Sequence, residues 1–168
     1  MGTASSKNGR TKPADRIEVR KSGVHGRGVF AKGRIRKGAR IIEYVGRRLP
    51  WKEAEEAPPL DPKRPYHTML FSLDNGDVID AAVGGNEARW INHSCDPNCE
   101  TYEDGDRIFV HALRGLQPGE ELFYDYKMVP SERRTKKLEK EFGCLCGTPK
   151  CRGTMLAPKK RRRAKKRN

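Results

Sequence analysis

Residues 89–99 read RWINHSCDPNC. An aromatic and apolar start leads into residues 92–99, of which only Pro97 lacks a polar or thiol side chain. So many groups able to bind metal or form hydrogen bonds, gathered in one turn, indicate a site at this bend. Buried groups of this kind need partners, which other parts of the chain must supply.

The chain contains five cysteines, at positions Cys95, Cys99, Cys144, Cys146 and Cys151. The last three form a C-x-C-x4-C pattern, which fits a zinc site because zinc commonly takes four tetrahedral thiolate or imidazole ligands. The fourth ligand would come from the 89–99 stretch, which offers Cys95, Cys99 and His93. A closed four-ligand site is normally structural, so the metal would fasten the C-terminal segment onto this bend. The alternative is a group of small buried thiols or a disulfide.

The net charge of +14 over 168 residues is concentrated at the two ends. Residues 158–168 carry eight positive charges and no negative ones, residues 1–16 add a net +3, and only +3 is left for residues 17–157. Because like charges repel and neither end has an apolar cluster, we expect residues 1–15 and 158–168 to be disordered. The basic C-terminal run can neutralise phosphates, which predicts a nucleic-acid tether, with a nuclear localisation signal as the alternative.

Length and hydropathy predict one folded domain without a membrane span. No stretch approaches 18 consecutive apolar residues, and the N-terminus has no apolar signal-peptide core. We therefore expect an intracellular protein, located in the nucleus or at chromatin in a eukaryote or a host cell, and in the cytoplasm or nucleoid in a bacterium. Thiols stay reduced in such compartments, which favours metal binding over disulfides.

Short β-rich runs separated by turn residues dominate the chain. Strands are expected at 17–19, at the end of the glycine-punctuated stretch 23–31, and at 41–46, 68–73, 78–83, 107–112 and 121–126, with a hairpin turn at 74–77. Helical segments are expected at 51–57, which Pro58-Pro59 ends, at 85–91 and, exposed, at 131–141. This distribution predicts a mostly β fold of several small sheets.

Two further segments carry candidate functional residues. Alternation along 121–126 places Tyr124 and Tyr126 on one face of the strand, and buried tyrosines normally need a partner for the hydroxyl. The turn His25-Gly26-Arg27-Gly28 indicates that backbone approaches another group closely or takes positive φ. A phosphate loop is disfavoured there because no Gly-Lys-Ser/Thr follows. Packed core tyrosines and a tight hairpin are the simpler interpretations of these two segments.

Taken together, HGRGVFA, IIEYVG, RWINHSCDPNC, GEELFYDY and the final C-x-C-x4-C resemble, in order and approximate spacing, the SET-domain protein lysine methyltransferases. The resemblance covers about residues 16–157 and is closest to members with a post-SET zinc segment. A cysteine-rich pre-SET region is not expected, because no cysteine precedes Cys95. The resemblance implies a β-clip SET fold at 16–130, with knot-like threading of the NHSC segment through a loop closed by the C-terminal strand. It also implies a zinc-bound post-SET segment at 131–157.

The resemblance implies roles for individual residues. S-adenosyl-L-methionine would be bound by the glycine turn, the bend and the C-terminal segment, through His25, Gly26, Arg27, Gly28, Asn92, His93 and Leu145. Zinc would be held by Cys95, Cys144, Cys146 and Cys151, which leaves Cys99 as a packed thiol. Tyr126 would be the catalytic hydroxyl that orients the substrate lysine, and Tyr124 would limit the product to mono- or dimethyl-lysine.

One position departs from the family pattern. Members usually carry a tyrosine where this chain has Met69, so one wall of the lysine channel loses a hydroxyl. Compensation would have to come from Tyr66 or His67.

The implied reaction is methyl transfer to lysines of histones or histone-like basic DNA-binding proteins. Acidic side chains that could attract basic substrate tails are Glu53, Glu55, Glu56, Glu100, Glu103, Asp104 and Asp106. The basic C-terminal run is then also a candidate for automethylation. Two other functions stay open. One is an inactive SET-fold chromatin module, which Met69 favours, and the other is a small zinc-dependent nucleic-acid binder, which leaves GEELFYDY and HGRG without purpose.

Overall fold

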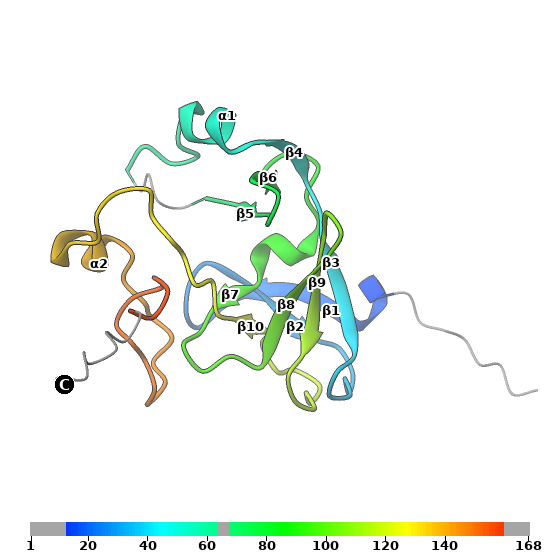
Figure 1. The fold of residues 1–168 in the computed structure, drawn as a ribbon. Coiled ribbons are helices and arrows are strands. Elements are labelled where there is room, and N and C mark those ends of the chain that lie inside the picture. The colour runs from blue at the N-terminus through cyan, green and yellow to red at the C-terminus, as the bar shows by residue number, and fades with distance from the viewer. Residues whose placement is uncertain (1–12, 64–67, 160–168) are drawn as a thin grey trace, which may run out of the picture.

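Residues 13–63 and 68–159 are described by the computed structural model, in which short strands form four small sheets (Figure 1). Two of these sheets have two strands and two have three. The helices of the described residues are short, with at most six residues each. This confirms the predicted mostly β fold of several small sheets.

The first sheet is a hairpin of β1 (Ile17–Lys21) and β2 (Arg27–Ala31), which pair antiparallel along their whole length. Gly26 lies in the turn between them with φ +50, a backbone conformation that glycine adopts without strain. The 3-10 helix η1 (Pro13–Arg16) precedes β1, so the described structure begins three residues before the predicted start at residue 16.

The central sheet has the order β3-β9-β8, with β3 (Arg40–Tyr44), β9 (Arg107–Ala112) and β8 (Cys99–Asp104) all antiparallel. Its inward side chains form the middle of the main hydrophobic core. The sequence does not predict β8, because the stretch CETYED is mostly polar and shows no apolar alternation. Continuous pairing with β9, six residues against six, makes it a strand.

The third sheet has the order β4-β6-β5, formed by β4 (Arg47–Pro50), β6 (Asp77–Asp80) and β5 (Leu70–Ser72). β5 and β6 form the predicted hairpin, although both strands are shorter than predicted. The helix α1 (Trp51–Glu56) follows β4 directly and packs its one buried residue, Ala54, into a small cluster with residues of this sheet. The predicted helix at 51–57 is confirmed, whereas β4 is not predicted from the sequence.

The fourth sheet consists of two two-residue strands, β7 (Asn92–His93) and β10 (Phe123–Tyr124), which pair in parallel. The 3-10 helix η2 (Glu87–Trp90) leads into β7, as predicted for 85–91. The predicted strand at 121–126 is too long, because its residues have different partners. Glu121 forms a bridge with β2, only 123–124 pair with β7, and Lys127 turns the chain with φ +47.

The C-terminal segment contains α2 (Lys136–Glu141), so the helix predicted at 131–141 is wrong in its start, and it is mostly exposed as predicted, with Leu138 buried. The helix begins after Thr135, whose hydroxyl accepts a hydrogen bond from the Leu138 N–H, as an N-cap does. Leu138 and Phe142 are buried in a separate cluster with Leu156. In Figure 1 this segment lies on the left of β7 and β10, and the β3-β9-β8 sheet lies on the right.

Some predictions fall on residues outside the described ranges. They concern the N-terminal residues 1–12, the C-terminal residues 160–168 and the proposed compensation by Tyr66 or His67. Within the described part of the chain, no helix has the length and apolar character that a bilayer crossing requires.

Candidate functional site

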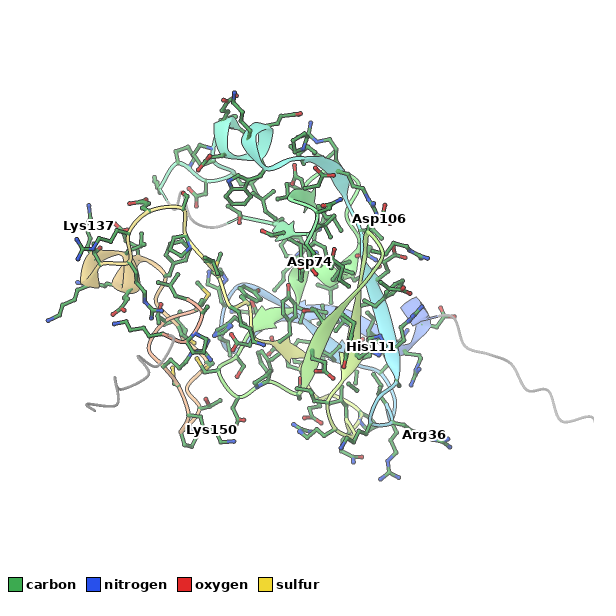
Figure 2. The ribbon with its side chains drawn as sticks, viewed as in Figure 1. Arg36, Asp74, Asp106, His111, Lys137 and Lys150 are labelled. Atoms are coloured by element: carbon green, nitrogen blue, oxygen red, sulfur yellow. The ribbon has the colours of Figure 1, made fainter. Side chains whose placement is uncertain are left out.

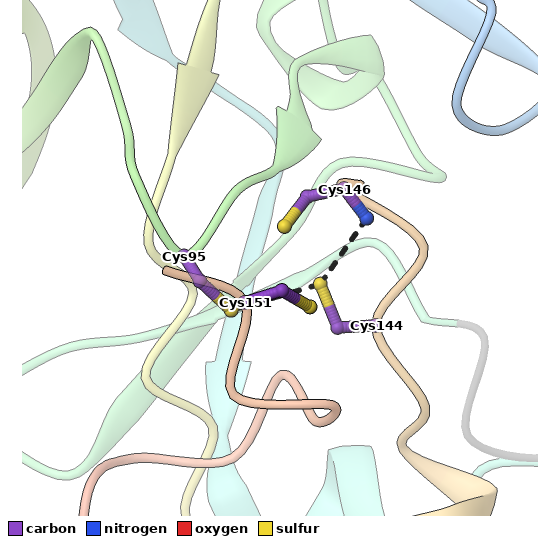
Figure 3. A group of neighbouring side chains, drawn as sticks. All are labelled: Cys95, Cys144, Cys146 and Cys151. Atoms are coloured by element: carbon purple, nitrogen blue, oxygen red, sulfur yellow. Dashed lines mark hydrogen bonds between the residues drawn. The ribbon is translucent and has the colours of Figure 1, made fainter. Parts of the chain in front are cut away.

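The four cysteines expected to bind zinc come together, with their sulfur atoms all within 4.8 Å of one another (Figure 3). Cys95 lies in the bend after β7, and the other three lie in the C-terminal segment. The Cys95 and Cys144 Sγ atoms are 3.7 Å apart, close to the roughly 3.8 Å between two thiolates on one tetrahedral zinc at about 2.3 Å per bond. All five cysteines are free thiols, so the alternative of a disulfide is contradicted.

Backbone N–H groups point at the cluster, as they do around thiolate ligands of structural metals. Cys144 Sγ accepts from the Cys146 N–H at 3.4 Å, and Cys95 Sγ accepts from the Arg152 N–H at 3.3 Å. Burial raises the pKa of the Cys95 and Cys144 thiols. Burial also opposes ionisation of Cys146, but hydrogen bonds from Thr148 and from neighbouring groups lower its pKa to about 6. Metal binding requires thiolates, and Cys146 is the thiol of these three that ionises most readily.

The other two candidates for the fourth ligand are excluded from the cluster. Cys99 is completely buried in the main core, and burial raises the pKa of its thiol to about 12. It is a packed neutral thiol. His93 lies next to the cluster and makes a 3.4 Å contact from its Nε2 to Cys95 Sγ. Only cysteines make up the group of potential ligands among the described residues.

Asn98 explains a large part of the polar character of the bend. Its buried side chain donates from Nδ2 to the Glu121 carbonyl at 2.7 Å and accepts at Oδ1 from the Phe123 N–H at 2.8 Å. The amide thus pairs with the backbone of the 121–123 segment as a neighbouring strand would. The bend at 92–98 is held against this segment, which is the contact that the threaded arrangement requires. The threading itself stays a prediction.

Replacing Asn98 by alanine is expected to lower the free energy of unfolding by about 2–4 kcal/mol, because a half-buried carbonyl and a half-buried N–H both lose the buried amide as their partner. Urea unfolding would measure this. Asn75→Ala is the matched control, since Asn75 makes similar bonds in the exposed hairpin turn and should cost no more than about 1 kcal/mol. Equal losses in the two variants would contradict the role assigned to Asn98.

Asn92 joins the bend to the glycine turn. Its Nδ2 donates to the carbonyls of His25 at 3.1 Å and Arg27 at 2.8 Å, and it lies 3.1 Å from Glu121 Oε1. Gly28 leaves the space that this arrangement needs, because a Cβ at that position would lie 2.1 Å from Glu121 Oε1. The predicted cofactor residues 25–28 and Asn92 therefore lie side by side.

His93 is buried, and both of its ring nitrogens have protein partners. Nδ1 accepts from the Tyr126 N–H at 3.1 Å, which leaves the proton on Nε2, facing Cys95. Burial lowers the pKa of His93 to about 4, although the nearby Asp125 carboxylate opposes this shift. The imidazole is therefore neutral and fully engaged. If His93 contacts the cofactor as expected, it does so through its main chain.

The two tyrosines of the predicted strand lie together on one side, with ring centroids 5.0 Å apart. The Tyr126 hydroxyl donates to the Ile91 carbonyl at 2.8 Å, and the Tyr126 ring packs edge-on against His93 at 5.2 Å. Burial raises the pKa of Tyr124 and of Tyr126 well above the usual value. Both hydroxyls therefore stay protonated at neutral pH and can donate hydrogen bonds.

Tyr44 is a candidate site residue that sequence reasoning missed. It is buried at the end of β3, its ring lies 5.4 Å from Phe71, and the Phe71 ring lies 6.3 Å from Tyr124. The Tyr44 hydroxyl donates to the Met69 carbonyl at 2.7 Å. A tyrosine hydroxyl from β3 therefore lies next to the backbone of the apolar Met69. Tyr44 is the tyrosine of the IIEYVG motif, but the local sequence pattern does not show which sheet lies next to the site.

Leu145 and the acidic candidates lie on the surface. Leu145 is 67% exposed between two cluster cysteines, where it is available to cover a ligand. Several acidic groups already have protein partners, which weakens their expected role in attracting substrate. Asp106 pairs with Arg48, Asp104 lies 4.0 Å from Arg40, and Glu103 accepts from the Asp74 N–H.

Comparison with known proteins gives consistent matches. A family model described as the SET domain matches residues 26–127. Histone-lysine N-methyltransferase TRX1 of Oryza sativa subsp. japonica is 38% identical over 146 residues, which is 83% of this chain and 14% of that protein. Histone-lysine N-methyltransferase 2B of Homo sapiens is 39% identical over 140 residues, 81% of this chain and 5% of that protein.

A fungal protein gives a similar match. The H3 lysine-4 specific histone-lysine N-methyltransferase of Saccharomyces cerevisiae is 40% identical over 151 residues, 87% of this chain and 13% of that protein. The chain therefore spans between 5% and 14% of the length of these three relatives.

Proposed function

The chain belongs to the SET-domain family, and on that basis we propose that it transfers a methyl group from S-adenosyl-L-methionine to lysine side chains of histones or histone-like basic DNA-binding proteins. The sequence relatives carry the name histone-lysine N-methyltransferase, and one of them is named as specific for H3 lysine 4. The activity and the substrate class of this chain are proposed from these matches and from its own site.

The observation that supports the proposal most is the junction of β7 and β10. Phe123 pairs with Asn92, and Tyr124 pairs with His93. This pairing joins the residues proposed to bind the cofactor, around Asn92 and the glycine turn, to the proposed catalytic Tyr126. Donor and acceptor sites built on these two strands would share one wall, which a direct transfer between two bound molecules requires.

The residues near Tyr126 suit the presentation of a lysine amine. When bound, S-adenosyl-L-methionine supplies an electrophilic sulfonium methyl. The amine must be neutral to react, which at pH 7 costs about 4–5 kcal/mol for a free lysine of pKa about 10.4. Aromatic walls from Tyr44, Phe71 and Tyr124 would disfavour the charged form. The protonated Tyr126 hydroxyl would orient the nitrogen.

The direct test is transfer of radiolabelled methyl groups to mixed histones and to bacterial basic proteins. Label on lysine of any of these substrates supports the proposal. The small zinc-dependent nucleic-acid binder and the inactive chromatin module both predict no transfer to any substrate. Mapping of the labelled sites by mass spectrometry then identifies the target lysine.

We infer that Cys95, Cys144, Cys146 and Cys151 hold zinc, as their spacing and chemistry fit. The metal would be structural, because the four thiols close its coordination. Residues 131–157 would then act as a post-SET segment that covers the cofactor, with Leu145 as the covering side chain. The neighbouring His93 would donate from Nε2 to the Cys95 thiolate and orient it.

Tyr124→Phe is expected to shift the product from mono- and dimethyl-lysine toward trimethyl-lysine. The Tyr124 hydroxyl would crowd the channel beside Tyr126 and hold a water there, and its loss makes room for a further methyl group. Mass spectrometry of a histone peptide after long incubation gives the product distribution. Trimethyl-lysine as the main product of the unchanged protein would contradict this assignment.

We propose that the basic C-terminal run tethers the protein to DNA, which would place a eukaryotic or host-delivered protein at chromatin and a bacterial one at the nucleoid. Deleting residues 158–168 removes eight positive charges. DNA affinity at low salt should fall by more than about tenfold, and the dependence of log affinity on log salt should become less steep by several units. Fluorescence anisotropy over a salt series measures both quantities. Unchanged DNA affinity after the deletion would contradict the proposed tether.

A further inference from the structure

Arg152, in the C-terminal segment, contacts both the thiol cluster and residues 123–126, the tyrosine segment that carries Tyr124 and Tyr126. Arg152 donates from Nη1 to Asp125 Oδ2 at 2.9 Å and from Nη2 to Asp125 Oδ1 at 2.8 Å. The side chains are 24% and 13% exposed. Such a pair of parallel bonds sets the orientation as well as the distance of the two groups.

Asp125 lies between Tyr124 and Tyr126, directly after β10, and its carboxylate binds the backbone of the turn that follows. Its Oδ1 accepts from the Lys127 N–H at 3.2 Å, where the backbone turns with φ +47, and lies 3.5 Å from His93 Nδ1. That same ring nitrogen accepts from the Tyr126 N–H. The Asp125 carboxylate therefore fixes the turn that directly follows Tyr126.

The other end of the connection is the thiol cluster. Arg152 directly follows Cys151, and its N–H donates to Cys95 Sγ at 3.3 Å. Its Nε is buried and has no hydrogen-bond partner among the described residues. A buried donor without a partner carries a free-energy cost. The Arg152 guanidinium is therefore placed to bind Asp125, although this position leaves its Nε without a hydrogen bond.

We propose that Arg152 is a positioning residue, which couples closure of the thiol cluster to the placement of Tyr126 through Asp125. The inference rests on the proposed function for the role of Tyr126. In addition, the C-terminal segment with its cysteines and the tyrosine segment 123–126 stabilise each other. Because coupling between two sites is reciprocal, loosening either one loosens the other.

The first test compares Arg152→Lys with Lys150→Ala. Lysine keeps the charge of Arg152 but loses the paired bonds. Its kcat should fall about 10- to 100-fold, as a small misplacement of a reacting group does. KM for the histone peptide should stay nearly unchanged. Lys150 also forms an ion pair between the C-terminal segment and the bend, with Asp96 at 3.0 Å, and lies at the outer edge of the segment (Figure 2).

Lys150→Ala should leave kcat within about twofold, because exposed ion pairs contribute little. Equal losses of kcat in the two variants, or none in Arg152→Lys, would overturn the proposal. A comparable fall of kcat with a large rise in KM would also count against it, because that points to lost substrate binding.

The second test needs no methyl transfer. Asp125→Asn changes the tyrosine segment and replaces no cysteine. It should speed the loss of zinc from the zinc-loaded protein to a chelator by about tenfold, which is the usual effect of losing an outer-shell partner. The double variant with Arg152→Lys should lose zinc no faster than the faster single variant, because both changes break one contact. An unchanged zinc release in Asp125→Asn, or additive effects in the double variant, would overturn the coupling.

The two tests also separate this proposal from the proposed function. If the unchanged protein transfers no methyl group to any histone, the proposed function fails. The zinc-release comparison then still decides whether the two segments are coupled.

Discussion

Tyr126→Phe is expected to abolish most of the proposed methyl transfer, with kcat reduced about 100- to 1000-fold, the usual effect of removing one hydrogen-bond donor from a reacting centre. The substitution removes only the hydroxyl that donates to the Ile91 carbonyl at 2.8 Å. The ring and its edge-on contact with His93 remain. A radiolabelled-methyl assay at saturating histone peptide and cofactor measures the loss.

Folding should survive this change, because one lost hydrogen bond costs about 1 kcal/mol. Tyr102→Phe is the matched control, since it removes the same hydroxyl from a side chain that is 56% exposed on β8. This control should keep the activity of the unchanged protein. Full activity of Tyr126→Phe with a normal melting temperature would exclude Tyr126 as the catalytic hydroxyl.

The second large effect is expected from loss of a metal ligand. Cys146→Ser should weaken zinc binding by more than about 100-fold, since outer-shell partners alone are worth about 10–100-fold. Native mass spectrometry and chelator competition measure this. Hydrogen exchange of residues 144–153 should rise at the same time, because the cluster connects this part of the segment to the bend at Cys95.

The activity should fall together with the zinc content, because the released segment no longer covers the cofactor or contacts Asp125. Cys99→Ser is the matched control. Cys99 is a thiol of the same bend, buried and outside the cluster, so its loss should affect stability but not zinc content. One equivalent of tightly bound zinc in Cys146→Ser would contradict the assignment of the ligands.

Most of the candidate site consists of residues that the sequence already singled out. The glycine turn, Asn92, Tyr126 and the cluster cysteines lie in short motifs whose residue types are unusual for ordinary turns and strands. The strands at 27–31, 40–44 and 107–112 follow from their apolar patterns. The strand at 121–126 was predicted too long, because alternation cannot show that one segment changes partners twice.

The residues that sequence reasoning missed act over long distances along the chain. No local pattern assigns Asn98 a partner, yet its amide pairs with the 121–123 backbone. The Tyr44 ring packs against Phe71 of another sheet, and the helix expected at 131–141 is shorter and buries Leu138. In each case the partner lies 12 or more residues away, and no local pattern specifies it.

The amino-acid sequence by itself determined the chemistry of this protein, because thiols, glycines and tyrosines at fixed short spacings restrict what a segment can bind. Only the tertiary structure decided which of these groups meet. The Arg152–Asp125 contact, the packing of Tyr44 against Phe71 and the partner of Asn98 depend on how four small sheets pack. A polar side chain can satisfy its hydrogen bonds in many ways, and burial in one packed arrangement selects among them.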